Sequence, residues 1–162
     1  MPDPRYEKLA HVLTGHATRV QPGEFVLIET FDIPDDMTIA LIRSVREHSG
    51  HPLVSIKHNR IQRELIRGSE AENLALIGEV EAYRMNRVQA YIGVRGSHNI
   101  SELSDVATQD MERYEKAWLQ PVHFNIRVPR TKWCVLRWPT TSMAQQAGQS
   151  TESFEDFYFD AC

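Results

Sequence analysis

Residues 25–56, FVLIETFDIPDDMTIALIRSVREHSGHPLVSI, decide the fold class of this chain. They begin with the unbroken apolar run Phe25–Ile28, and unbroken apolarity favours a strand that is covered on both faces. A helix is predicted next, because Pro34 can open it, apolar positions recur along it and Gly50 can end it. A second apolar run, Leu53–Ile56, follows that helix. The stretch therefore predicts a β-α-β unit, whose two strands run parallel with a right-handed crossover.

Helical and strand patterns continue to alternate on both sides of this unit. The other expected elements are helices at 4–16, 61–66, 70–88 and 102–119, strands at 88–94 and 132–136, and an extended, irregular connection at 121–129. Such alternation is typical of an α/β fold, in which helices cover both faces of a mainly parallel sheet. We expect a three-layer, Rossmann-like architecture with about four or more strands. The pattern does not determine the order of the strands in the sheet.

The composition is that of one ordinary globular domain. The chain has 162 residues, of which 41% are hydrophobic, and this is enough for a substantial core. A formal charge of -4 gives no reason to expect binding to nucleic acid or to an anionic membrane. No run of about eighteen apolar residues is present, so no membrane span is expected. The N-terminal residues MPDPRYEKLA lack an apolar signal core, which favours a cytoplasmic protein.

Ligands of open α/β sheets bind beyond the carboxyl ends of the strands, so the loops at those ends are searched first. Neither G-x-G-x-x-G nor G-x-x-x-x-G-K-[ST] occurs, so neither a dinucleotide site nor a nucleoside triphosphate site is indicated. The segment Arg95–Asn99 follows the third predicted strand. Its arginine and nearby backbone amides could hold a carboxylate or a phosphate, although a glycine turn beside an exposed arginine is the simpler interpretation.

Neither metal binding nor nucleophilic catalysis is indicated by the remaining reactive side chains. His51 and His58 flank a predicted strand of seven residues, which would separate them by roughly 23 Å at about 3.3 Å per residue. Cys134 lies inside a strand, where burial makes a thiol unreactive. Glu29 and Asp32 could form an acid/base pair, or they could simply precede the next helix, where acidic residues are favoured. No complete catalytic site follows from these residues.

Two short helical segments separated by Gly148 are predicted after the strand at 132–136, and the second carries an aromatic face that needs a partner surface. Spacings of three and four place Phe154, Phe157 and Tyr158 on one side of this helix, with Phe159 beside them. We interpret this face as core or interface, and the three residues are the interface candidates. Because the sequence stops within the helix, we expect the chain to be a piece of a longer protein.

Several stretches closely resemble the metal-dependent aminopeptidases of the thermophilic aminopeptidase T and aminopeptidase S type, which are leucyl aminopeptidase-like. The most specific is VLRWPTTSMAQQAGQSTESFEDFYFDAC at residues 135–162, in which Gln149 stands where the family usually has Met. The others are YEKLAHVLTGHATRVQPGEFVLIE at 6–29, HPLVSIK at 51–57 and YIGVRGSHN at 91–99. The resemblance covers essentially the whole chain.

This resemblance implies that residues 1–162 are the single N-terminal α/β domain of a two-domain hydrolase that releases N-terminal amino acids from peptides. Two divalent metal ions (zinc, cobalt or magnesium) would lie in the absent C-terminal catalytic domain, so this chain would bind none and would be inactive alone. The parent is expected to be a homodimer. Within this chain, the residues after strands three and four that would face the substrate cleft are Arg95, Asn99, Pro139 and Thr140.

Two alternatives remain open. The chain could be a stand-alone α/β domain that binds a small anionic ligand at Arg95–Asn99. It could also be an assembly module that dimerises through its aromatic C-terminal face.

Overall fold

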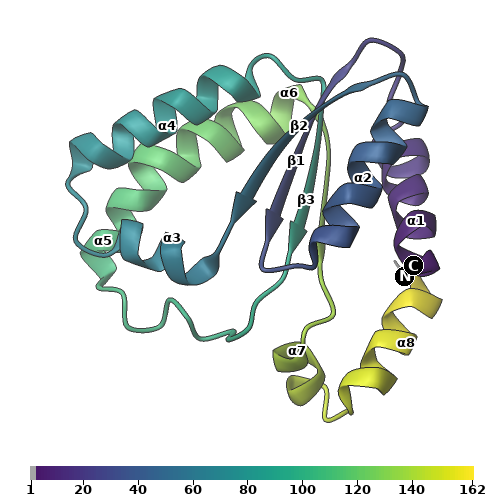
Figure 1. Ribbon diagram of the computed structural model, residues 1–162. Helices are drawn as coiled ribbons and strands as arrows, with labels where there is room; N and C mark the ends of the chain where they lie inside the picture. The colour runs from purple at the N-terminus through teal and green to yellow at the C-terminus, as the bar shows by residue number, and fades with distance from the viewer. Residues whose placement is uncertain (1–2) are drawn as a thin grey trace.

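The computed structural model describes residues 3–162 and contains one parallel sheet between two layers of helices (Figure 1). The strand order is β2-β1-β3-β4, and every pair is parallel. The three-layer α/β class predicted from the sequence is therefore confirmed. The strands are β1 (Phe25–Phe31), β2 (His51–Lys57), β3 (Ala90–Arg95) and β4 (Lys132–Arg137).

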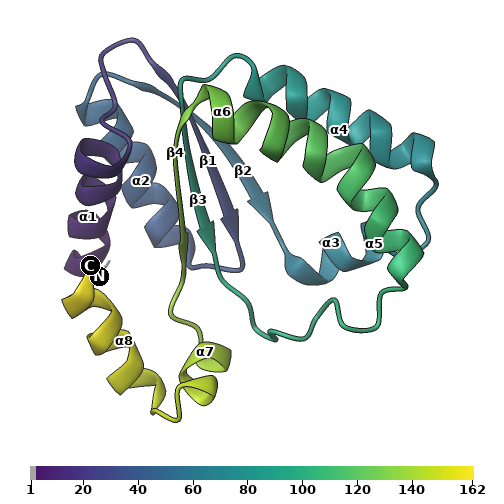
Figure 2. The same ribbon diagram turned by 180° about the vertical axis from the view of Figure 1, so that it is seen from behind.

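Each face of the sheet is covered by helices from different parts of the chain (Figure 1, Figure 2). One face carries α1 (Pro4–His11), its π-helical continuation η1 (Val12–Ala17) and α2 (Asp35–Glu47), and the chain returns to this side through α7 (Thr141–Gln146) and α8 (Thr151–Ala161). The other face carries α4 (Ala71–Met85), the π-helical segment η2 (Glu115–Arg127) and α6 (Val128–Arg130). Two short helices, α3 (Asn59–Ile66) and α5 (Thr108–Tyr114), lie beside the carboxyl ends of the strands.

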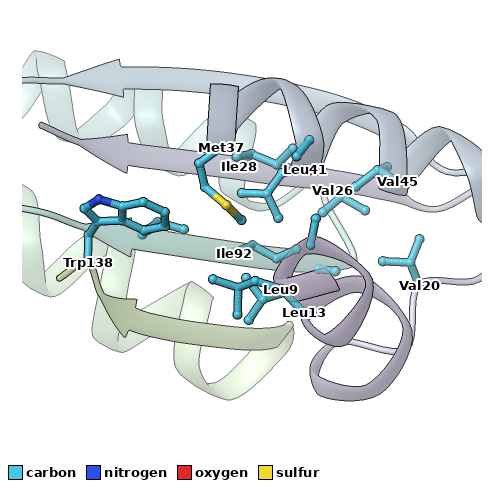
Figure 3. Packing of buried hydrophobic residues seen from close by; sticks show 14 residues of the cluster. Leu9, Leu13, Val20, Val26, Ile28, Met37, Leu41, Val45, Ile92 and Trp138 are labelled. Atoms are coloured by element: carbon cyan, nitrogen blue, oxygen red, sulfur yellow. The ribbon is translucent and has the colours of Figure 1, made fainter. Parts of the chain in front are cut away.

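The strands alternate between two separate cores, as the pleat of a sheet requires. On the α1/α2 side, Val26 and Ile28 of β1 and Ile92 of β3 pack with Met37 and Trp138 (Figure 3). On the α4/η2 side, Leu27 and Tyr91 pack with helix residues that include Leu74, Met85, Trp118 and Val122. Within the apolar run that opens β1, Val26, Leu27 and Ile28 are thus buried on both faces, as predicted, whereas Phe25 at its start is 44% exposed.

The predicted extended connection at 121–129 is wrong, because this segment is helical. The side chains of Trp118, Val122 and Ile126 recur every fourth residue and all lie in the core on the α4/η2 side. Their burial outweighs the helix-breaking signal of Pro121, which has no N–H to donate and lies within η2. The helix predicted at 102–119 likewise begins later, at Thr108, and residues 101–106 form turns and a bend.

The fourth strand is less buried than its apolar sequence indicates. β4 is an edge strand, paired only with β3, and its Trp133 is 44% exposed. Within residues 3–162, no helix combines the length and the apolarity that crossing a bilayer demands.

Candidate functional site at the carboxyl end of the sheet

Asp32, the residue after β1, joins the loops that follow three neighbouring strands. Its backbone has a φ of 47°, in the left-handed region, which turns the chain sharply out of the sheet. Its carboxylate accepts hydrogen bonds from the backbone N–H and the Nδ2 of Asn59, at 3.0 and 2.7 Å, and lies 2.9 Å from Nδ1 of His58. Asn59 also donates to the carbonyl oxygen of Gly96 at 2.9 Å. One carboxylate and one amide therefore fix the geometry of this end of the sheet.

The carboxylate of Asp32 is held in its ionised form. Partial burial by itself raises the pKa of Asp32, but the hydrogen bonds from Asn59 and His58 outweigh it and leave the pKa below its ordinary value. An anionic Asp32 favours a proton on Nδ1 of His58, so that His58 can present Nε2 as the free nitrogen. The pair is therefore suited to accept a hydrogen bond from a polar group that enters the loop region.

Two grooves meet at Asp32, His58 and His98. The larger, of about 790 Å³, extends along α3 and includes Asn99 in its lining. The smaller, of about 380 Å³, includes Pro139 and Thr140. Three of the four predicted cleft residues thus lie around one centre. Sequence reasoning missed His58 and His98 as members of this centre, although His58 directly follows β2 and His98 lies in the loop after β3, and those positions could have identified them.

Two of these cleft residues are buried within the smaller groove, whereas Asn99 is exposed. Thr140 is 8% exposed, and its Oγ1 lies 3.0 Å from Oγ of Ser142. Ser142 in turn donates to the carbonyl oxygen of Ser97 at 2.6 Å. The loops after β3 and β4 are therefore hydrogen-bonded to each other, and both contribute residues to the lining of the smaller groove.

Arg95, the fourth predicted cleft residue, belongs to a different cavity on the α4/η2 side of the sheet. The same side contains Glu29, which is 3% exposed and accepts a 2.7 Å hydrogen bond from the hydroxyl of Tyr91. Lys57 lies 3.1 Å from Oε2 of Glu29 and donates to Glu81 at 2.6 Å. Because Glu29 is committed to these partners and Asp32 lies in the grooves, the two carboxylates do not form the acid/base pair that their spacing allowed.

The described residues do not provide a set of ligands for a metal ion. Within residues 3–162, no three His, Cys, Asp or Glu side chains are grouped in a way that could hold one. Cys134 packs half-buried against the core on the α1/α2 side, and burial raises the pKa of its thiol, which disfavours the reactive thiolate. The arrangement at the carboxyl end can therefore bind polar groups, but the part of the chain described here does not assemble a two-metal centre.

The aromatic face of α8 divides into a buried and an exposed part. Tyr158 and Phe159 pack on Trp138, with ring centroids 6.3 and 5.8 Å away, so they extend the core on the α1/α2 side. The ring centroids of Phe154 and Phe157 lie 6.4 Å apart, and Phe157 is 61% exposed. Of the three interface candidates, Tyr158 thus belongs largely to this core, whereas Phe157 presents most of its ring to the surface.

Comparison with known proteins decides the family. A family model described as thermophilic metalloprotease (M29) matches residues 3–162. The chain belongs to this family. A solved structure of wild-type AmpT from Thermus thermophilus matches with a TM-score of 0.72 and 17% identity, over 97% of this chain and 42% of the AmpT chain. A search of curated proteins gives no match.

Membership of the thermophilic metalloprotease family confirms the resemblance noted in the sequence. The family uses a divalent metal for peptide hydrolysis, and the likeness to AmpT at this identity confirms the fold. This chain spans about 42% of the length of the AmpT chain.

Proposed function

We propose that this chain is the N-terminal α/β domain of a longer metallo-aminopeptidase, and that it forms one wall of the substrate cleft without supplying the metal ligands. The observation that carries the proposal is the combination of a family match over residues 3–162 with coverage of only 42% of the AmpT chain.

The two grooves around Asp32 are the surface that would face the cleft. They offer the Asp32–His58 pair, His98 and the Asn99 side chain, which together can donate and accept hydrogen bonds along an extended peptide backbone. Binding energy from such a wall orients the peptide relative to the metal ions. The chemistry itself, in which two metal ions activate water and polarise the scissile carbonyl, would belong to the other domain.

Activity assays of the 162-residue chain test the proposal directly. The purified chain is expected to release no chromophore from aminoacyl p-nitroanilides in the presence of zinc, cobalt or magnesium. The same protein extended by the sequence that follows residue 162 in its gene is expected to be active with one of these metals. Metal-dependent turnover by the 162-residue chain alone would overturn the proposal.

A separate experiment on the extended protein tests whether the grooves around Asp32 contact the substrate. Asn99→Ala should raise KM for peptide substrates several-fold and leave kcat and metal content nearly unchanged, because it removes binding and not chemistry. Asn86→Ala is the matched control, since Asn86 is exposed and lies at the other end of the sheet, directly after α4. If the two substitutions affect KM equally, the grooves around Asp32 do not contact the substrate.

We further propose that the parent enzyme is cytoplasmic and homodimeric, with the exposed Phe157 as part of the buried surface between domains or subunits. Sedimentation of the extended protein over a concentration series tests the dimer. Phe157→Ser should weaken the association of domains or subunits, and a strict monomer at high concentration would refute the homodimer.

A further inference from the structure

A small cavity of about 170 Å³ lies between the sheet and η2, apart from the two grooves around Asp32. Arg95 at the end of β3 lines its exposed side, and Arg127 at the end of η2 lines it from within. Tyr114 and His123 also line the cavity. The two arginines are 32 residues apart in the chain, so the fold itself brings them to one cavity.

Arg127 has more hydrogen-bond donors than its surroundings satisfy. Its side chain is 5% exposed, and a guanidinium carries five N–H donors. Nη1 lies 3.1 Å from Nδ1 of His123, and the group stacks 3.7 Å from the centre of the Tyr91 ring. Nη2 is 3.9 Å from Glu29 Oε1, beyond hydrogen-bond range, and Nε has no partner within residues 3–162. A buried donor without an acceptor lowers the stability of the folded protein, so an additional acceptor in the cavity would be stabilising.

The neighbouring groups also present donors to this cavity. Burial lowers the pKa of His123, and Arg127 and Arg95 lower it further, so its imidazole is neutral at pH 7. When Nδ1 accepts from Arg127, the proton of the neutral ring lies on Nε2, which becomes a donor. Burial raises the pKa of Tyr114, which keeps its hydroxyl protonated. That hydroxyl accepts a hydrogen bond of 3.4 Å from Gln62, and its own proton remains available.

The charges around the cavity favour a monoanion over a dianion. Glu29 and Glu81 contribute two negative charges, which Lys57 and Arg127 balance at close range. Arg95 adds a single further positive charge at the entrance. A phosphate dianion would bring excess negative charge beside the buried Glu29 and the partly buried Glu81, whereas a carboxylate would neutralise the cavity. The volume equals that of roughly six waters at about 30 Å³ each, which suits a small carboxylate and excludes a peptide of several residues.

We propose that this cavity binds one small carboxylate group, whose oxygen atoms accept hydrogen bonds from Arg95 and from the buried Arg127. Planar bidentate pairing is the preferred way for arginine to hold a carboxylate. Tyr114 and His123 supply the remaining donors, and the exposed Arg95 allows the ligand to enter from solvent. The site is independent of the peptidase chemistry proposed above, since none of its residues belongs to the grooves around Asp32 except Asn59, which lines both regions.

Titration of the 162-residue chain with sodium acetate, followed by heteronuclear NMR at constant ionic strength, tests the site. Saturable shifts are expected at the amides and side chains of the cavity lining, with sodium phosphate binding more weakly. Arg95→Gln should weaken acetate binding about tenfold, since it removes a charge-assisted pair. Arg137→Gln is the matched control, because Arg137 is the exposed register partner of Arg95 on β4 and does not line this cavity.

Arg127→Lys provides a second, conservative variant that keeps the buried charge and removes the fork of donors. It should also lose acetate binding while it retains a dispersed, folded spectrum. The proposal is overturned if acetate gives no saturable shifts, if phosphate binds more tightly than acetate, or if Arg137→Gln weakens binding as much as Arg95→Gln.

The carboxylate could come from a free metabolite or from an Asp or Glu side chain elsewhere in the parent protein. Repeating the titration with the extended protein separates these sources. If acetate still binds there, the ligand is a free small carboxylate. If the cavity no longer takes up acetate, and Arg95→Gln then lowers the melting temperature of the extended protein more than that of the 162-residue chain, the carboxylate is a side chain of the protein. Failure of the peptidase proposal would leave the acetate titration of the 162-residue chain unaffected.

Discussion

Tyr91 on β3 donates a 2.7 Å hydrogen bond to Glu29 on β1, across the place that Gly93 leaves open. Gly93 is the register partner of Glu29, and a Cβ atom at this position would lie 2.9 Å from the hydroxyl of Tyr91. The absence of a side chain at Gly93 thus lets an aromatic residue two positions earlier on β3 reach a buried carboxylate on the adjacent strand. This contact anchors the group of buried charges on the α4/η2 side.

Removal of the Tyr91 hydroxyl should destabilise the protein. Tyr91→Phe keeps the ring but takes a donor from buried Glu29, so the free energy of unfolding should fall by about 1–3 kcal/mol. Urea denaturation followed by circular dichroism measures the change. Tyr83→Phe is the control, because Tyr83 is 65% exposed and its hydroxyl can bond to water. Equal effects of the two substitutions would mean that the bond to Glu29 contributes nothing.

Glu29 should make the protein sensitive to acid. Burial alone would raise the pKa of Glu29, but Lys57, Arg127 and the Tyr91 hydroxyl outweigh burial and hold it below the ordinary value of 4.5. The unfolded chain therefore takes up this proton at higher pH than the folded chain does. The contribution of Glu29 to stability is complete above the unfolded pKa and is lost as pH falls through the folded pKa.

The measurement is the unfolding free energy of the wild type and of Glu29→Gln between pH 7 and pH 3. The variant should be less stable at pH 7, and the difference between the two proteins should shrink as the pH falls below about 4.5. Glu79→Gln, at an exposed position on α4, should leave the pH profile unchanged. A difference that is constant across this range would contradict the assignment.

Gly78 is required for the close contact between α4 and η2. A Cβ atom at this position would lie 2.3 Å from the carbonyl oxygen of Ala117, which is backbone and cannot rotate away. Gly78→Ala should therefore cost about 1–3 kcal/mol of stability despite the better helix propensity of alanine. In Gly15→Ala the nearest atom is the movable side chain of His48 at 3.3 Å, so thermal denaturation should show a much smaller change.

The two ends of the aromatic face of α8 should respond differently to truncation. Phe159 packs on Trp138 and Tyr6 and lies under the guanidinium of Arg5, 4.6 Å from its ring centre. Phe159→Ala should lower the unfolding free energy by about 1–2 kcal/mol, less than for a fully buried Phe, and should change the tryptophan fluorescence. Phe157→Ala should leave the stability of this chain within about 0.5 kcal/mol, because most of that ring is already exposed. The reverse ranking would show that α8 is turned relative to the sheet.

The fold class could be predicted because local patterns and burial agree along residues 25–56. The apolar run of β1 is continuous since both faces are covered, and the helix between β1 and β2 has one apolar side since only one side meets the sheet. The strand order could not be predicted, because it depends on which edges pair and not on the pattern of any single strand. The helical path through Pro121 was missed for a related reason: packing of Trp118 and Val122 on the sheet outweighs a local propensity.

The candidate site was predicted only as far as strand-end positions allow. Asn99, Pro139 and Thr140 lie around one centre because the carboxyl ends of parallel strands share an edge of the sheet. Strand-end position alone does not distinguish the two faces of the sheet, whereas the parity of Arg95 with Tyr91 and Gly93 along β3 places it on the α4/η2 side, away from the grooves. The partnership of Arg95 with Arg127 required the path of η2, which was the least predictable part of the chain.

Asn59 links the loop after β2 to those after β1 and β3, through Asp32 and the carbonyl of Gly96. A Cβ atom at position 96 would lie 2.5 Å from the carbonyl oxygen of Asp32, so the loops after β1 and β3 also touch directly. The loops after β1, β2 and β3 are therefore mechanically coupled and can shift only together. Insertions or deletions during divergence of the family should be excluded from them and should accumulate instead in the exposed turns at 100–105, where the backbone hydrogen bonds are local ones between residues three apart.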